Sequence, residues 1–189
     1  MYPMAASAAA GPADRWQPPA GGRRFHLRLA LARLAFALVP PFVLSRARVL
    51  ALRACGVRLG AGSFFWGSPT LLGAGAVASR LRVGRECGFN DGCLFDLAAP
   101  VTFGDHVAVG HQVRFLTRED PASAPAGQAP RAAPISVGDG AWLGARCTIL
   151  AGVTIGPGSV IGAGVTVGED VPPQTLVTGA QKVSLLRWR

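Results

Sequence analysis

Lysine is almost absent from this chain, although the chain is basic. Lys182 is the single lysine among 189 residues, and 19 basic residues against 10 acidic ones give a formal net charge of +9. A basic balance suits anionic partners such as nucleic acid, anionic lipid or a phosphorylated cofactor, without choosing among them. Charged residues make up only 15% and hydrophobic residues 50%. This composition argues against an intrinsically disordered chain.

Other absences restrict the class of protein. No two of the four cysteines form a C-x-x-C pair, which argues against a zinc knuckle or a thiol redox motif. The apolar run Leu34–Leu44 has 11 residues and contains a proline pair, whereas a membrane-spanning helix needs about 20 apolar residues. The apolar stretch nearest the start carries Arg28 and Arg33 and has no clear small-residue cleavage site, so no secretory signal peptide is expected. We therefore expect a cytoplasmic protein with reduced thiols.

Two segments precede the regular part of the sequence. Residues 1–22 are rich in alanine, proline and glycine, which predicts a disordered tail. Residues 23–56 combine leucine-rich faces with arginines and predict a basic amphipathic helical segment, broken at Pro40 and Pro41. Two roles stay open for this segment. It forms a helical cap whose apolar face packs on the domain, or it lies on an anionic membrane and makes the protein peripherally membrane-associated.

From Leu59 onward, large apolar residues return with a period of six. The pattern is clearest near the C-terminus, at Val137, Leu143, Ile149, Ile155, Ile161 and Val167. It slips by two residues within 95–102 and loses its phase between Leu116 and Pro134. A period of six suits neither an ordinary helix nor an ordinary strand. It indicates an internal structural repeat.

Each group of six, or hexad, has a second regular position. Counting from the large apolar residue, the fifth position is small or β-branched throughout: Cys87, Cys93, Val107, Val113, Ala141, Cys147, Val153, Ser159, Val165 and Val171. One large and one small interior residue fit a short strand followed by a tight corner, where glycine permits a positive φ. Three such units make a triangular coil of about 18 residues, and successive coils stack about 4.8 Å apart.

This geometry predicts an all-β, parallel β-helix over residues 57–175. A loop is extruded from it at 117–133, and a short C-terminal tail follows at 176–189. Val137 should lie under Ile155, with the neighbouring hexads stacked in the same way. The cysteines at the small position are predicted to be packing residues.

Three segments resemble the hexapeptide-repeat acyltransferases, whose fold is a left-handed parallel β-helix. They are FNDGCLFDLAAPVTFGDHVAVG at 89–110, PISVGDGAWLGARCTILAGVTIG at 134–156 and IGAGVTVGEDVPPQTLVTG at 161–179. Their order around an extruded loop is similar to the branch containing maltose, galactoside and nodulation O-acetyltransferases. The resemblance covers about residues 50–180. It implies the left-handed coil, a homotrimer with active sites between subunits, acetyl-CoA as acyl donor, and a sugar or glycoside hydroxyl as acceptor.

The resemblance also locates a departure from the family. The family's loop motif T-x-x-His-Pro supplies the general base, but here residues 117–121 read TREDP, so Asp120 stands at the histidine position. Aspartate is a weaker base near neutrality because its ordinary pKa is about 3.9 against about 6.5 for histidine. A general base typically contributes about 10²–10⁴-fold in rate. Asp120 therefore acts as a poor base, His111 replaces it, or positioning alone carries catalysis.

A histidine pair raises a second possibility, which we reject. His106 and His111 resemble the spacing in γ-class carbonic anhydrases of the same fold. Those enzymes need a third histidine about two coils upstream, and none lies between His26 and His106. We expect no metal. Both histidines fall at corner positions, where exposure without a catalytic role is the alternative.

The remaining site residues come from matches to the family motifs. Asn90 and Asp96 match acceptor-pocket positions, although both residue types also make corner hydrogen bonds. The expected acetyl-CoA contacts are Trp142, Ala145, Ala163 and Lys182. Trp142 would wall the thioester end, the alanines would present backbone groups to the pantetheine arm, and Lys182 would meet the phosphates. Each role has an alternative. Trp142 could be an ordinary packing residue, the alanines could be small residues required by the corner, and Lys182 could belong to a solvated basic tail.

Two functions of different class follow. The first is a CoA-dependent O-acetyltransferase that acts on a hydroxyl of a sugar or glycoside. The second is a catalytically decayed or non-catalytic β-helix that serves as a scaffold or binding protein, because Asp120 replaces the family's histidine. Nucleic-acid binding is not expected, since aromatic residues do not interleave with the arginines.

Overall fold

The computed structural model describes residues 44–118 and 131–179, and the backbone of 181–184. The expected tail at 1–22, the first part of the helical segment, and Asp120 lie outside the described residues. Fifteen short strands wind into five triangular coils, three strands to a coil, so that each side of the column is a parallel sheet.

The three sheets have the following members. Sheet A contains β1 (Arg58–Leu59), β4 (Leu81–Val83), β7 (Val101–Phe103), β10 (Ile135–Val137) and β13 (Thr154–Ile155). Sheet B contains β2 (Phe64–Phe65), β5 (Gly88–Phe89), β8 (Ala108–Val109), β11 (Trp142–Leu143), β14 (Val160–Ile161), β16 (Thr175–Thr178) and β17 (Gln181–Ser184). Sheet C contains β3 (Thr70–Leu72), β6 (Leu94–Asp96), β9 (Arg114–Leu116), β12 (Thr148–Ile149) and β15 (Thr166–Val167). A 3₁₀ turn, η1 (Ala78–Arg80), precedes β4.

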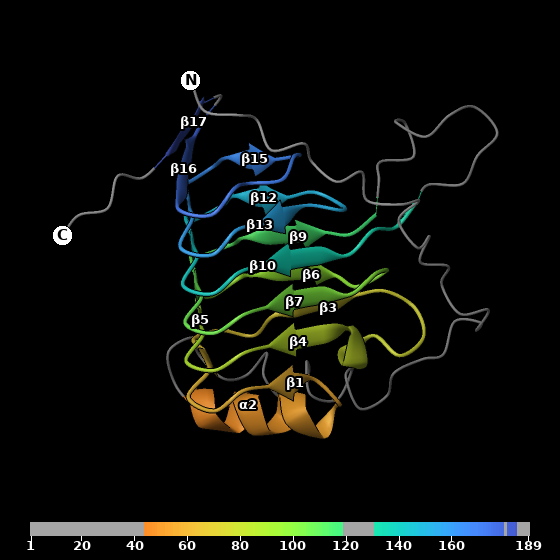
Figure 1. The fold of residues 1–189 in the computed structure, drawn as a ribbon. Coiled ribbons are helices and arrows are strands. Elements are labelled where there is room, and N and C mark those ends of the chain that lie inside the picture. The colour runs from red at the N-terminus through yellow and green to blue at the C-terminus, as the bar shows by residue number, and fades with distance from the viewer. Residues whose placement is uncertain (1–43, 119–130, 180, 185–189) are drawn as a thin grey trace.

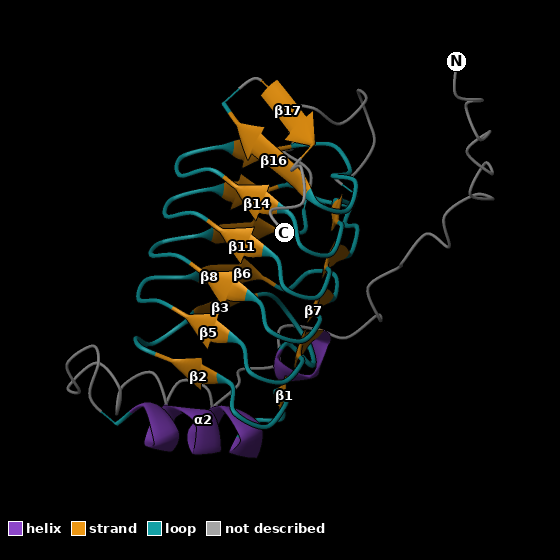
Figure 2. Ribbon diagram, turned by 60° about the vertical axis from the view of Figure 1, so that its left-hand side comes forward, coloured by secondary structure: helices purple, strands orange, loops and turns teal. Residues whose placement is uncertain are grey.

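The winding is left-handed, as expected. In Figure 1 the chain climbs from α2 (Ser45–Ala54) at the bottom to β17 at the top. It runs leftward along the near sheet A and returns rightward along the far sheet C. Figure 2 shows the strands of sheet B stacked above α2.

The predicted stacking of hexads is confirmed. Val137 pairs with Ile155, Leu143 with Ile161, and Ile149 with Val167. Every residue at the predicted small position is buried, including the three cysteines Cys87, Cys93 and Cys147. Since each coil repeats the same side-chain sizes, the interior side chains of successive coils stack closely on one another.

Phenylalanines replace aliphatic residues at interior positions of the first three coils. The rings of Phe65 and Phe89 stack with centroids 4.5 Å apart, and those of Phe95 and Phe115 stack at 5.0 Å. Phe103 meets Phe115 edge to face at 5.0 Å. Aromatic pairs in these geometries add about 0.5–1.5 kcal/mol each beyond area burial.

Helix α2 closes the bottom of the column. Val49 and Leu52 are buried against the first coil, and so is Arg48, whose Nη1 donates to the carbonyl of Trp66 at 3.3 Å. Arg53 donates to the carbonyl of Leu59 at 3.0 Å. This part of the helical segment therefore packs on the domain. Among the described helices, none is long and apolar enough to span a bilayer.

The top of the column differs from expectation. We expected a tail from residue 176, but β16 adds another strand to sheet B, pairing with β14, and β17 folds back antiparallel to β16. The reason is that Val177 continues the interior ladder above Ile161, where it is buried. The antiparallel strand then covers a sheet edge that would otherwise be open.

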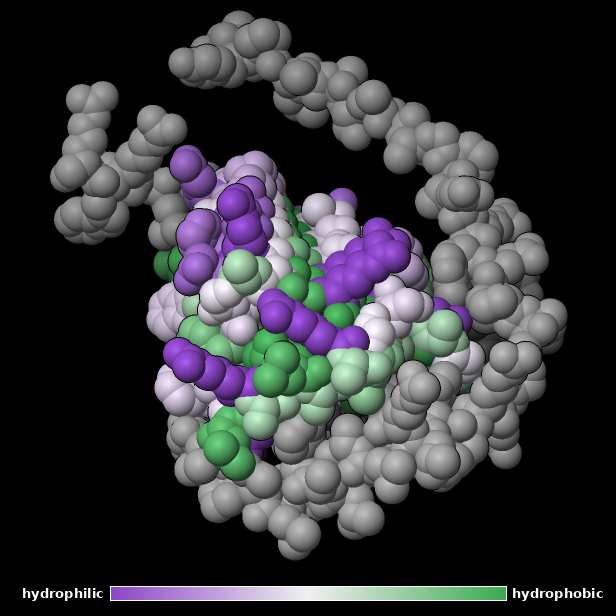
Figure 3. All heavy atoms as spheres, turned by 90° about the horizontal axis from the view of Figure 1, so that it is seen from below, coloured by the Kyte–Doolittle hydropathy of each residue, from purple (hydrophilic) through white to green (hydrophobic). Residues whose placement is uncertain are grey.

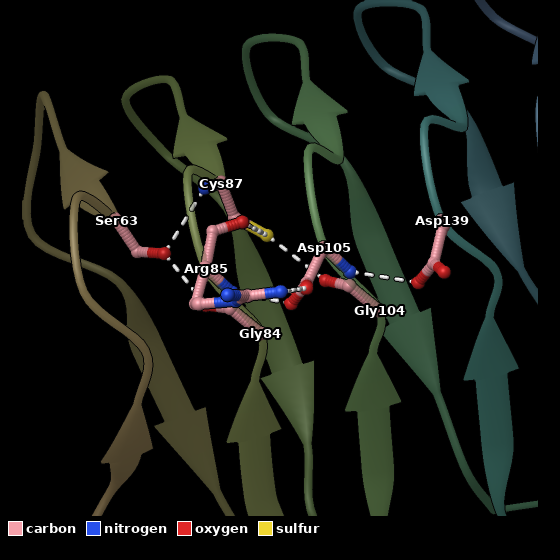
Figure 4. A network of polar contacts seen from close by, with 7 residues as sticks. All are labelled: Ser63, Gly84, Arg85, Cys87, Gly104, Asp105 and Asp139. Atoms are coloured by element: carbon pink, nitrogen blue, oxygen red, sulfur yellow. Dashed lines mark hydrogen bonds and ion pairs between the residues drawn. The ribbon is translucent and has the colours of Figure 1, made fainter.

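Hydrogen bonds between side chain and backbone tie the coils along the corner between sheets A and B (Figure 4). The carboxylate of Asp139 accepts from the N–H of Asp105 at 2.8 Å, and Asp105 accepts from the N–H of Arg85 at 2.8 Å. The Arg85 guanidinium also donates to Asp105 Oδ2 at 2.7 and 3.0 Å. These Arg85 hydrogen bonds lower the pKa of Asp105. In the same network, Ser63 donates to the carbonyl of Gly84 at 2.7 Å.

Candidate functional site

An open groove of about 620 Å³ runs along the corner between sheets B and C. Its lining residues are Asp91, His111, Gln112, Ala145, Arg146, Ala163 and Gly164. They come from four successive coils, because the two residues that turn the chain after each sheet B strand fall at the same corner. Side chains distant in sequence are therefore arranged as a column.

Backbone hydrogen bonds hold this column in register. The N–H of Gln112 donates to the carbonyl of Asp91 at 2.9 Å, and the N–H of Arg146 donates to the carbonyl of His111 at 2.7 Å. The N–H of Gly164 continues the series by donating to the carbonyl of Ala145 at 2.8 Å. The groove wall is thus as rigid as the sheets beside it.

The second residue of each corner adopts a left-handed conformation. Gln112 has φ 57° and Arg146 has φ 61°. The Nε of Arg146 donates to Oε1 of Gln112 at 3.1 Å. This contact places an exposed guanidinium along the groove. An arginine held in this way can bind phosphate or carboxylate groups.

The first residue of each corner supplies the predicted site residues. His111 is exposed in the groove, between Asp91 one coil below and Ala145 one coil above. Ala145 is half-buried and Ala163 is exposed. Because alanine carries only a methyl group, the upper wall of the groove consists largely of backbone. The structure therefore brings together His111, Ala145 and Ala163, which were predicted separately.

Trp142 lies beside this groove rather than in its lining. It stands on β11, on the outer face of sheet B, with 56% of its surface exposed. Such exposure argues against the alternative that Trp142 is an ordinary packing residue within a single chain. An exposed tryptophan next to a groove suits contact with a ligand or another subunit.

The two predicted acceptor residues occupy different corners. Asn90 is half-buried beside Asp91, and its Nδ2 donates to the carbonyl of Val109 at 3.2 Å. Asp96 ends β6 at the corner between sheets C and A, away from the groove. A single chain therefore does not join Asp96 to His111.

Asp96 is engaged in an ion pair at the base of the extruded loop. Its Oδ2 and Oδ1 accept from Nε and Nη2 of Arg118 at 3.0 and 3.1 Å. Oδ1 also accepts from the N–H of Ala98 at 3.2 Å. The hydrogen bond to Asp96 raises the pKa of Arg118. The buried hydroxyl of Thr117 donates to the carbonyl of Asp96 at 2.8 Å, which fixes the point where the loop departs.

The other predicted residues are only partly described. Asp120 follows Arg118 by two positions and lies outside the described residues. The backbone of Lys182 belongs to β17 and pairs with Val177. Within the described part of the chain, no group of three or more His, Cys, Asp or Glu side chains is placed to hold a metal ion.

Sequence reasoning missed four residues of the groove lining: Asp91, Gln112, Arg146 and Gly164. The signal that would have found them is the hexad register itself. Gln112 follows His111, and Arg146 follows Ala145, so both occupy the second corner position next to a residue that was predicted. Motif matching considered only positions with a family counterpart and passed over these neighbours.

The chain is similar to several known proteins. Residues 134–169 match the family model described as bacterial transferase hexapeptide (six repeats). A provisionally named acetyltransferase of Schizosaccharomyces pombe is 38% identical over 99 residues, which cover 51% of this chain and 48% of that protein. The sophorolipid acetyltransferase of Starmerella bombicola is 51% identical over 90 residues, which cover 46% and 34% of the two chains. This chain thus spans about half or less of the length of these curated relatives.

Solved structures match over more of the chain. A hexapeptide-repeat acetyltransferase from Vibrio cholerae O1 biovar eltor, in complex with acetyl-CoA, superposes with a TM-score of 0.67 at 28% identity. The match covers 82% of each chain. A maltose O-acetyltransferase from Clostridium difficile 630 superposes with a TM-score of 0.62 at 24% identity, over 82% and 81% of the two chains. The latter similarity concerns the fold alone.

Proposed function

We propose that this chain, which resembles the hexapeptide-repeat transferases, is an O-acetyltransferase that moves acetyl from acetyl-CoA to a hydroxyl of a sugar or glycoside. One observation carries the proposal. His111, Ala145 and Ala163 lie in one groove, on a fold shared with an acetyltransferase solved with acetyl-CoA. The carbohydrate acceptor is supported by the similarity to the sophorolipid acetyltransferase.

The donor side of the groove fits an extended thioester carrier. Small side chains at Ala145 and Ala163 let the pantetheine arm approach the backbone closely. Arg146, held by Gln112 at 3.1 Å, offers a guanidinium to a phosphate group. The chain therefore contributes two features to acetyl-CoA binding: a groove with small side chains along its wall, and one guanidinium held in position.

On the acceptor side, His111 is the base that the groove supplies. An imidazole can take the proton of an acceptor hydroxyl near neutral pH. The hydroxyl oxygen then attacks the thioester carbonyl, the carbon–sulfur bond breaks, and the proton passes to the sulfur of the departing CoA. His111 thereby takes the role that the family's loop histidine would have and that Asp120 fills poorly.

We further propose a homotrimer, with sheet B facing the neighbouring subunit. One column of outward positions on sheet B, paired in register from β2 to β16, is non-polar throughout: Phe64, Gly88, Ala108, Trp142, Val160 and Leu176. The matching positions of sheet A are Arg58, Arg82, Thr102, Ser136 and Thr154. Burying the apolar column against a partner would stabilise assembly. It would also place a second chain beside the groove, as acceptor binding between subunits requires.

The chain offers a matched pair for testing the base. His111 and His106 are both exposed corner histidines, but His106 lies at the corner between sheets A and B, outside the groove. We expect His111→Ala to lower kcat by about 10²–10⁴-fold, and His106→Ala to leave it unchanged. The measurement is CoA release from acetyl-CoA with a panel of sugars, glycosides and glycolipids. If His111→Ala is harmless while Asp120→Asn abolishes turnover, the base is Asp120 instead.

A gain-of-function variant complements this test. If catalysis is limited by the weak base on the loop, Asp120→His should raise the rate of acetyl transfer. No CoA release above the background rate with any acceptor, together with no CoA-dependent thermal shift, would overturn the transferase proposal. That result would favour the non-catalytic scaffold.

A further inference from the structure

The lower end of the column contains no acidic residue. Between residues 44 and 85 the chain has seven arginines and no aspartate or glutamate, and Glu86 is the first acid after this stretch. The stretch forms α2, the whole first coil and the start of the second. Arg48 is buried and Arg85 pairs with Asp105, so the surface charge of this end comes from the other five arginines: Arg46, Arg53, Arg58, Arg80 and Arg82.

The same end exposes large apolar side chains. Leu44 is 59% exposed and Leu50 is 65% exposed, both on or beside α2. Between α2 and β2 lies a groove of about 590 Å³ with Val49, Leu50, Phe64 and Trp66 among its lining residues. Arg46 and Arg53 line it as well. Figure 3 views this end directly and shows strongly hydrophilic side chains alternating with apolar ones.

We propose that this end of the column, comprising α2 and the first coil, docks on an anionic lipid membrane. Exposed leucines can enter the boundary between headgroups and acyl chains, while arginines around them meet the anionic headgroups. Trp66, which lines this groove and lies outside the sheet B column assigned to the subunit interface, suits the interfacial zone that tryptophan favours.

Charge complementarity selects the membrane over other occupants. A second copy of the same surface would bring like-charged arginines together, which opposes association. Residues 1–43 of this chain carry five arginines and one acid, so they do not complement the surface either. Nucleic acid would match the charge, but it offers no apolar phase for Leu44 and Leu50.

The test uses the full chain and vesicles of phosphatidylcholine, either alone or mixed with phosphatidylserine, in a co-sedimentation assay. We expect binding to the mixed vesicles, weakened by salt, and much less to phosphatidylcholine alone. Arg46→Glu reverses one charge at the docking end and should weaken binding by about thirtyfold, because each arginine near an anionic surface is worth about fivefold in affinity. Leu50→Ser should weaken binding without changing charge.

The matched control is Arg114→Glu, the same charge reversal on the outer face of sheet C. It should leave lipid binding close to that of the unaltered chain. The proposal would be overturned if Arg46→Glu and Arg114→Glu lost the same amount of lipid binding. It would also be overturned if Arg46→Glu lost no lipid binding, or if Leu50→Ser lost none. Tighter binding to duplex DNA than to the mixed vesicles would overturn it as well. Thermal unfolding curves of each variant distinguish lost docking from lost folding. CoA release is measured separately, because docking does not depend on the groove between sheets B and C.

Discussion

At the scale of single residues, the corners of the coils impose two different demands on glycine. Gly140 has φ +65°, and no neighbouring heavy atom lies within 4 Å of where a Cβ would stand, so it meets only the cost of a left-handed backbone. Gly138 has an ordinary φ, but a Cβ there would lie 2.6 Å from the backbone nitrogen of Pro157 in the next coil. One position is restricted by conformation and the other by the spacing between coils.

These demands predict different costs for the same substitution. Gly140→Ala should lower the free energy of unfolding by about 1–2 kcal/mol through left-handed strain. Gly138→Ala should cost about 3 kcal/mol, because two backbones must separate. Gly168→Ala, where the nearest atom is Leu150 Cδ1 at 3.4 Å, serves as the control. Urea unfolding of the three variants measures the order, and a larger loss for Gly140→Ala would contradict the account.

The buried cysteines predict a second residue-scale behaviour. Burial raises the pKa of Cys93 and of Cys147 to about 12, and also raises the pKa of Cys87. In the native protein at pH 8, alkylation should therefore be confined to the half-buried Cys55. Mass spectrometry of the native and the urea-unfolded protein tests this. Rapid native labelling at Cys93 would contradict the packing role.

The same shifts have a defined effect on stability. The folded pKa values lie above the ordinary thiol value of 9.0, so the unfolded chain loses these protons first as pH rises. The contribution of the thiols to stability is full below pH 9 and is lost progressively as the pH approaches 12. Below pH 9 they contribute nothing to the pH dependence.

At the scale of elements, the ion pair between Asp96 and Arg118 helps to hold the base of the extruded loop, together with the hydrogen bond from Thr117 to the Asp96 carbonyl. The Asp96 side chain is 10% exposed and that of Arg118 is 54% exposed. Removing the guanidinium leaves a nearly buried carboxylate whose remaining donor is the N–H of Ala98. Since Arg118 is itself partly solvated, the cost is smaller than for a fully buried pair.

We accordingly expect Arg118→Ala to lower the free energy of unfolding by about 1–2 kcal/mol. Arg114→Ala, an exposed arginine on the strand that leads to the loop, should change it by less than about 0.5 kcal/mol. Chemical denaturation measures both, and proteolysis at 117–133 should accelerate only in Arg118→Ala. Equal behaviour of the two variants would mean that the ion pair does not anchor the loop.

The corner between sheets A and B predicts an acid-dependent element. Arg85 lowers the pKa of Asp105 below its ordinary value of 3.8. The stabilisation is therefore present above that ordinary value and is lost as the pH falls through the lowered folded value. Asp105→Asn should make the free energy of unfolding fall less steeply as the pH drops below the ordinary value for aspartate. Near neutral pH, the slope of the free energy of unfolding against pH should be the same in the variant and the unaltered chain. An unchanged acid limb would assign the acid sensitivity to other carboxylates.

At the scale of the whole molecule, the difference between the sheet faces predicts the assembly. Trp142→Asp places a charge in the apolar column of sheet B and should convert the proposed trimer to a monomer. Thr166→Asp, an exposed position on sheet C, should leave the trimer intact. Sedimentation velocity measures the mass of each. A trimer that survives Trp142→Asp would place the interface elsewhere.

Much of the fold was predictable from residues because its contacts recur at a regular separation of about one coil. A residue in this column meets the one about a coil away, so the pairing of Val137 with Ile155 follows directly from the period. The site was less predictable. His111 and Ala145 were expected from motif matches, but their common groove with Arg146 depends on the corner at which each hexad turns. Asp96 stays a prediction for an acceptor pocket, and within the single chain it pairs with Arg118, a partner in the next coil that no motif indicates.

By itself, the sequence determined a three-sided stack with one large and one small interior residue per hexad, because that alternation repeats and is satisfied between neighbouring coils. The tertiary structure alone decided which side chains share a corner, that β17 returns antiparallel over β16, and that α2 leaves Leu50 exposed among arginines. Those features depend on where the phase slips, at the loop and at the two ends of the column. At these points the period of six is lost, so the sequence no longer predicts which residues lie next to one another.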